Sequence, residues 1–110
     1  MSDSPSSEVI QFEVETPLGF RVRVTRGYWN LIVAIKHPVM AGRERDVQDT
    51  LKTPDEIRQS KRDPDVYLFY KTERIRRWVC AVSKRLNGDG FLITAYLTDA
   101  IKEGELVWPK

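Results

Sequence analysis

Residues 66–98 read VYLFYKTERIRRWVCAVSKRLNGDGFLITAYLT, and this stretch carries the clearest strand pattern of the chain. It contains three runs rich in aromatic and β-branched residues, which favour strands: 66–72, 75–84 and 91–98. The sequence NGDG at 87–90 is a strong turn signal between the last two runs. Consecutive strands joined by short links usually pair antiparallel. The stretch therefore predicts an antiparallel β-meander.

Residues 10–25 alternate apolar and polar side chains on either side of a loop, which predicts a β-hairpin with one buried face. A three-residue loop, 17–19, keeps both apolar sets on that face and places Gly19 in the left-handed region. On the polar face this register sets Glu13 opposite Arg23 and Glu15 opposite Arg21, so the two arginines are given a structural role. The apolar face then comprises Ile10, Phe12, Val14, Phe20, Val22 and Val24.

Two helices are predicted between the hairpin and the meander. The first covers Arg26–Lys36, with Thr25 as its N-cap and Pro38 preventing its continuation. The second covers Arg43–Lys52, where the apolar residues recur at helical spacing. The fold class is therefore α+β, with the hairpin first, two helices next, and the meander last, and with the helices on one face of the sheet.

Two short segments are less regular. Residues 53–56, Thr-Pro-Asp-Glu, have the form of a helical capping box, whereas 57–60 suit a short edge strand, which we prefer. Near the end of the chain, Asp99 is predicted to cap a last helical turn over 100–103, and Trp108 to cover the sheet edge or the margin of the core.

The length of 110 residues predicts a single domain, 9–110, after a disordered polar tail, 1–8. The longest apolar run, Leu31–Ile35, is too short to cross a membrane, and the first residues do not resemble a secretory signal. We therefore expect a cytoplasmic protein with no membrane partner. One cysteine, Cys80, and one histidine, His37, cannot build a Cys/His zinc cluster, so no metal and no cofactor are expected.

The net charge of +2 conceals an uneven distribution along the chain. Residues 21–85 carry 16 basic and 8 acidic side chains, whereas residues 1–20 carry four acids and no Lys or Arg. A basic block of this kind can meet a phosphate backbone, although it is also what scattered, solvated arginines produce. We take RNA as the candidate partner. The basic residues assigned to RNA binding are Lys36, Arg58, Lys61, Arg62 and Lys71.

His37 is the strongest candidate for proton transfer, because only histidine has an unperturbed pKa near neutrality. It follows the first predicted helix directly, so an alternative role is to cap the free carbonyls at that helix end. On the last strand, Thr94 and Tyr96 share a face by the period of two. Lys84 joins that face only if the intervening loop has the right parity. The three side chains suit a phosphate and its developing charge, although Thr and Tyr are also ordinary strand residues.

The order of these segments resembles the barnase/EndoU/colicin/RelE-like nucleases, over about residues 26–104. The markers are Lys36-His37-Pro38 after the first helix and Thr94-Ala95-Tyr96 on the last strand. The Lys-His pair is also similar to that of BrnT-type toxins in this group. The resemblance implies a RelE/barnase-like sheet with helices on one face, and a metal-independent ribonuclease, often a toxin with a cognate antitoxin or immunity protein. By the same resemblance, His37 is the acid/base, with Lys84, Thr94 and Tyr96 on the sheet.

The chemistry leads in the same direction. RNA carries its own nucleophile, the 2′-hydroxyl, whereas DNA hydrolysis needs an activated water and usually a metal. A nuclease with one histidine and no metal should therefore cleave RNA. We predict a toxin-like endoribonuclease that works by 2′-hydroxyl attack and uses His37, Lys84, Thr94 and Tyr96. The alternative is a non-catalytic module that binds RNA or a protein on the same surface, which the scarcity of acid/base groups favours.

Overall fold

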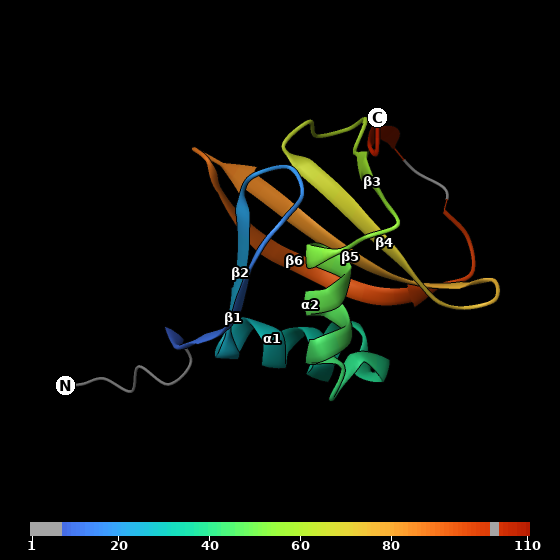
Figure 1. Cartoon of the computed structure of the whole chain (residues 1–110). Coiled ribbons are helices and arrows are strands. Elements are labelled where there is room, and N and C mark those ends of the chain that lie inside the picture. Colours follow the sequence, from blue (N-terminus) through green and yellow to red (C-terminus); the bar gives the residue numbers. More distant parts are fainter. Residues whose placement is uncertain (1–7, 102–103) are drawn as a thin grey trace.

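The computed structural model describes residues 8–101 and 104–110, and these form one mixed sheet with helices on one face (Figure 1). The sheet order is β1-β2-β6-β5-β4-β3-β7, and every neighbouring pair is antiparallel except β2 and β6. The predicted α+β class is therefore confirmed. The strands are β1 (Ile10–Glu15), β2 (Arg21–Thr25), β3 (Glu56–Gln59), β4 (Val66–Arg74), β5 (Arg77–Leu86), β6 (Asp89–Thr98) and β7 (Glu105–Trp108).

The N-terminal hairpin has the predicted register from Phe12 onward, but a register shift between Ile10 and Phe12 leaves Ile10 45% exposed instead of on the buried face. Phe12 faces Val24 and Val14 faces Val22 across β1 and β2, and Gly19 has a φ of 88° in the loop. On the polar face, Arg21 forms the expected salt bridge with Glu15, at 3.3 Å. Glu13 faces Arg23 in register as predicted, but within the described residues the Arg23 guanidinium forms no salt bridge. The Arg23 guanidinium is therefore available to bind a group outside the hairpin.

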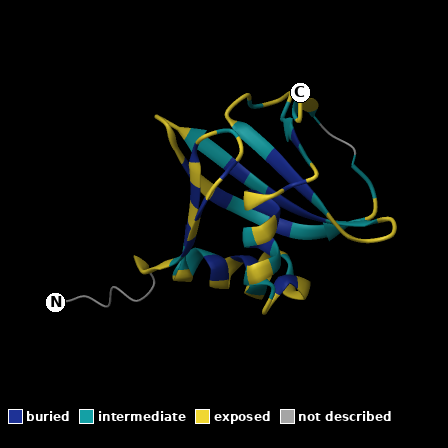
Figure 2. Ribbon diagram, in the orientation of Figure 1, coloured by how far each residue is buried: buried dark blue, intermediate teal, exposed yellow. Residues whose placement is uncertain are grey.

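Both predicted helices are confirmed. The first comprises α1 (Arg26–Leu31) and a π-helical continuation, η2 (Ile32–Lys36), and its N-terminus is capped by Thr25 Oγ1, which accepts from the Tyr28 N–H at 3.2 Å. The second, α2 (Glu44–Lys52), follows a 3₁₀ turn, η3 (Pro38–Met40). Their buried side chains pack on one face of the sheet, and Figure 2 shows buried bands along the strands. The helical members of this core are Trp29, Ile32, Met40, Val47 and Leu51.

The C-terminal segment differs from the prediction. Residues 100 and 101 are not helical; instead Thr98 Oγ1 donates to the Ala100 carbonyl and accepts from its N–H. The rest of the expected turn, 102–103, lies outside the described residues, as do residues 1–7 of the expected tail. The sequence analysis missed β7, which pairs with β3 and brings Trp108 to the margin of the core, as expected. The preferred strand at 57–60 is confirmed as β3, but it is not an edge strand as predicted, because β7 pairs with it on the side away from β4.

The second face of the sheet carries a smaller apolar cluster, centred on Leu68, Tyr70 and Cys80. We call this second face of the sheet the outer face. Cross-strand partners place Val82 and Thr94 on this face, since Leu68 faces Val82 and Val82 faces Thr94.

Within residues 8–101 and 104–110, none of the helices has the length and apolar character of a membrane-spanning helix.

The parallel contact between β2 and β6 joins the hairpin to the meander. It is short, with Val22 facing Gly90 and Arg23 facing Phe91. A Cβ on Gly90 would lie 2.6 Å from the Arg21 carbonyl oxygen and 2.8 Å from the Phe20 ring. This contact therefore requires glycine at position 90.

We predict that Gly90→Ala lowers the free energy of unfolding by about 1–3 kcal/mol, because the added methyl forces β2 away from β6. Urea denaturation measures the change. Ile75→Ala is the control, since Ile75 is 89% exposed and its truncation should cost less than about 0.5 kcal/mol. A Gly90→Ala protein as stable as the wild type would contradict the close approach of the two strands.

Candidate functional site

The backbone around His37 is fully engaged. Its N–H donates to the Ile32 carbonyl at 2.8 Å and its carbonyl accepts from the Met40 N–H at 2.9 Å. The backbone of His37 therefore caps the helix end. The alternative role, in which the imidazole side chain caps the free carbonyls, is not found. Among the described residues, the imidazole makes no hydrogen bond. It is partly buried, and its nitrogens remain available for proton transfer.

The His37 ring lies against the Tyr96 ring, with centroids 5.3 Å apart and an angle of 43° between the planes. His37 follows η2, which with η3 contacts β6, while Tyr96 lies near the C-terminal end of β6. Two residues that are 59 positions apart in the chain thus meet at the edge of the sheet. The predicted proximity of His37 to the Thr-Ala-Tyr strand is found.

Thr94 lies on the same face of β6 as Tyr96. Val82 faces Thr94 and Cys80 faces Tyr96, which sets both side chains on the outer face. Within the described residues, Thr94 Oγ1 is buried and has no hydrogen-bond partner. A buried hydroxyl without a partner is costly, so a ligand oxygen that reached this group would gain a hydrogen bond from it.

Lys84 does share this face, which resolves the question of parity. It stands two residues beyond Val82 on β5, and Val82 faces Thr94. Its ammonium group donates to Asp63 Oδ2 at 3.0 Å, from the loop between β3 and β4. The hydrogen bond from Lys84 and a second one from the Asp65 N–H lower the pKa of the Asp63 carboxyl. Lys84 is therefore held toward that loop.

Lys36 is the cation that the contacts place nearest Thr94. Its ammonium donates to the Ile93 carbonyl at 3.3 Å and to the Tyr28 hydroxyl at 3.1 Å, while the Tyr28 hydroxyl itself donates to the same carbonyl at 2.8 Å. Ile93 is the extra residue of a β-bulge in β6, since Val82 faces Thr94 while Ser83 faces Leu92. Lys36 thus binds the edge of the sheet through its side chain and directly precedes His37 in the chain.

The other basic residues assigned to RNA binding are in different positions. Lys71 lies on the face that carries the helices, where its ammonium donates to the Thr53 carbonyl at 2.6 Å. Arg58 is on the outer face but is engaged by Glu56 and by the Gly104 carbonyl. Lys61 and Arg62 are exposed in the β3–β4 loop that also carries Asp63. These two cations are therefore accessible on the Lys84 side of the site.

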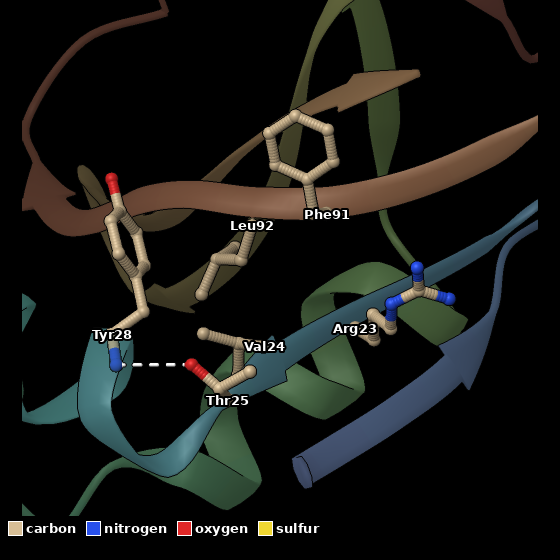
Figure 3. Close-up of a pocket in the computed structure, with 6 residues that line it drawn as sticks. All are labelled: Arg23, Val24, Thr25, Tyr28, Phe91 and Leu92. Atoms are coloured by element: carbon tan, nitrogen blue, oxygen red, sulfur yellow. Dashed lines mark hydrogen bonds between the residues drawn. The ribbon is translucent and has the colours of Figure 1, made fainter. Parts of the chain in front are cut away.

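A cavity of about 340 Å³ lies between β2 and β6, beside the start of α1 (Figure 3). The sequence analysis missed it. It is lined by Arg23, Val24, Thr25, Tyr28, Phe91 and Leu92. Simple alternation sets Phe91 on the face opposite to Thr94, but the bulge at Ile93 reverses this and brings Phe91 to the outer face, opposite Lys84. No local sequence signal indicates the bulge.

Within residues 8–101 and 104–110, no three His, Cys, Asp or Glu side chains gather in a group that could hold a metal ion. No family model, curated protein or solved structure matches the chain. The arrangement of His37, Tyr96 and Thr94 is therefore the basis for a functional proposal.

The Asp63–Lys84 ion pair predicts a pH dependence of stability. The folded-state pKa of Asp63 is lowered, so its stabilising effect is complete above the unfolded pKa of about 3.9 and is lost as the pH falls through the folded value. We expect Asp63→Asn to be less stable than the wild type at pH 7, with a difference that shrinks as the pH falls below about 4. Urea denaturation between about pH 3 and 7 measures this difference. A difference that stays constant with pH would show that the carboxylate charge has no part in it.

Proposed function

We propose that the protein is a metal-independent endoribonuclease that cleaves RNA by attack of the 2′-hydroxyl on the adjacent phosphorus. The observation that carries the proposal is the contact between His37 and Tyr96 beside the unpartnered Thr94 hydroxyl. It combines an imidazole, a phenol and a hydrogen-bond donor at one edge of the sheet. These groups suit a proton-transfer reaction at a phosphodiester.

The reaction balances with these groups. The 2′-oxygen forms a bond to phosphorus while its proton passes to the His37 imidazole. The bond from phosphorus to the 5′-oxygen breaks, and that oxygen takes a proton from the Tyr96 phenol. The products are a 2′,3′-cyclic phosphate and a free 5′-hydroxyl, and proton exchange with water restores both side chains.

Thr94 and two lysines supply the remaining roles. The Thr94 hydroxyl donates to a non-bridging phosphate oxygen, which gives it the hydrogen bond that it lacks. Lys36, one residue before His37, stabilises the charge that develops on phosphorus. Lys84 contributes at longer range, because its ammonium group is held by Asp63. The exposed Lys61 and Arg62 attract the RNA backbone.

A non-catalytic module that binds RNA or a protein is the second candidate. The ammonium groups of Lys36 and Lys84 already form hydrogen bonds, to the Ile93 carbonyl and to Asp63. Both groups are therefore less available to stabilise charge that develops in a reaction, which favours the non-catalytic candidate. The two candidates differ in whether His37 changes the covalent structure of RNA. A cytoplasmic location and a cognate antitoxin or immunity protein stay predictions.

We predict that the purified protein cleaves labelled single-stranded RNA in the presence of EDTA, and that His37→Ala lowers the rate by about 10²–10⁴-fold. Tyr96→Phe retains the ring against His37 and removes only the hydroxyl, so it should lower the rate without a loss of stability. Ile75→Ala, at an exposed position in the β4–β5 turn, is the control and should cleave at the wild-type rate. Uncleaved RNA with the wild type, or an unchanged rate with His37→Ala, would reject the enzyme.

We also predict that Lys61→Glu with Arg62→Glu weakens RNA binding and flattens its salt dependence. The physical reason is that each phosphate ion pair with a single strand contributes about 0.7 to the slope of log affinity against log salt. Fluorescence anisotropy at several salt concentrations measures the slope. The matched control is Arg74→Glu with Arg76→Glu, two exposed arginines at the far end of the β4–β5 hairpin. An equal weakening in both double variants would mean that only net charge matters.

A further inference from the structure

The cavity between β2 and β6 exists because the two strands pair over only two positions and then diverge. Figure 3 shows Val24 and Leu92 in the gap, with Tyr28 at one end and Arg23 toward the other, and with the Phe91 ring projecting from β6 away from β2. Val24 and Leu92 belong to the core and are 3% and 2% exposed. The floor of the cavity is thus apolar and well packed.

The rim of the cavity has a different character. Phe91 is 40% exposed, so this aromatic side chain is accessible from solvent. Beside it, Arg23 is exposed and, in the part of the chain that the structure describes, forms no salt bridge. The six lining residues include no acid. An exposed aromatic face beside an unpaired guanidinium is the combination that binds single-stranded nucleotides, by stacking and by a phosphate contact.

The cavity is linked to the proposed catalytic site through hydrogen bonds at the Ile93 carbonyl. Tyr28 lines it and donates its hydroxyl hydrogen bond to the Ile93 carbonyl, to which the Lys36 ammonium also bonds. His37 follows Lys36, and Thr94 follows Ile93. Phe91 and Thr94 lie on the same face of β6, three residues apart, which corresponds to about 10 Å along a strand. A neighbouring nucleotide of one RNA strand can span this separation.

From this arrangement we infer that the cavity is a base-binding subsite for single-stranded RNA. One nucleobase stacks on the Phe91 ring at the mouth of the cavity, and Arg23 donates hydrogen bonds to the phosphate of that nucleotide. The inference rests on the proposed ribonuclease function, which it extends by naming the form of the substrate. It also gives Arg23 a partner other than Glu13, the residue that faces it in the hairpin.

The test uses a fluorescent single-stranded oligoribonucleotide in which 2′-fluorine replaces each 2′-hydroxyl. Because this probe lacks the attacking group, binding is measured by anisotropy without cleavage. We expect Phe91→Ala to weaken binding by about fivefold to a hundredfold at every salt concentration, which is the range for removal of one stacked base. Phe91→Trp, which keeps an aromatic face, should bind at least as well as the wild type.

Arg23 and a matched apolar position complete the design. Arg23→Gln should lower the slope of log affinity against log salt by about 0.7, the value for one phosphate contact on a single strand. Leu86→Ala is the control for Phe91→Ala, because Leu86 lies in the same β5–β6 hairpin and is 43% exposed. It should change the affinity less than about twofold. Thermal unfolding of each variant verifies that it is folded.

The outcomes separate the subsite from the catalytic proposal. Binding by the wild type that Phe91→Ala weakens no more than Leu86→Ala does would overturn the subsite and leave cleavage untouched. Binding that depends on Phe91, together with no cleavage of natural RNA, would support the subsite and reject the enzyme. Absence of binding by the wild type at low salt would overturn the subsite, whatever the cleavage assay shows.

Discussion

The structure depends on the short parallel contact between β2 and β6. This contact unites the N-terminal hairpin with the meander in one sheet. It is possible because Gly90 has no side chain: a Cβ at this position would lie only 2.6 Å from the Arg21 carbonyl oxygen. Because the two strands then separate, the chain that leaves β2 as α1 and η2 can lie along the edge of β6. This path carries Tyr28, Lys36 and finally His37 to that edge.

The β-bulge at Ile93 is the second feature that shapes the site. It leaves the Ile93 carbonyl to accept hydrogen bonds from Tyr28 and Lys36 in place of a neighbouring strand, which ties the first helix to the sheet. It also reverses the alternation of side chains along β6. Phe91 therefore shares a face with Thr94, although an odd and an even position in one regular strand face opposite sides. The bulge aligns an exposed ring with the candidate catalytic groups.

Charge is distributed in a way that separates structural from available cations. Arg21, Arg58 and Lys71 are bound to groups of their own chain, and Lys84 is held by Asp63. Arg23 is in register with Glu13, yet in the described chain it forms no salt bridge. Much of the basic block in the middle of the sequence thus serves the fold itself. Exposed cations lie in the β3–β4 loop and beside the cavity next to β6, and also elsewhere, as at the far end of the β4–β5 hairpin.

The sequence is enough to predict the hairpin register from Phe12 onward, the two helices, the three meander strands and the shared face of Thr94 and Tyr96, because each of these follows from local periodicity, turns and caps. It also singled out His37, since no other histidine exists. The parallel β2–β6 pairing, the bulge, β7 and the choice of arginines without a salt bridge are seen only in the folded chain. These features depend on contacts between segments that are distant in the sequence. The close backbone approach at Gly90 sets the strand pairing, and the extra residue Ile93 sets the bulge. Neither feature produces a periodic pattern in the sequence.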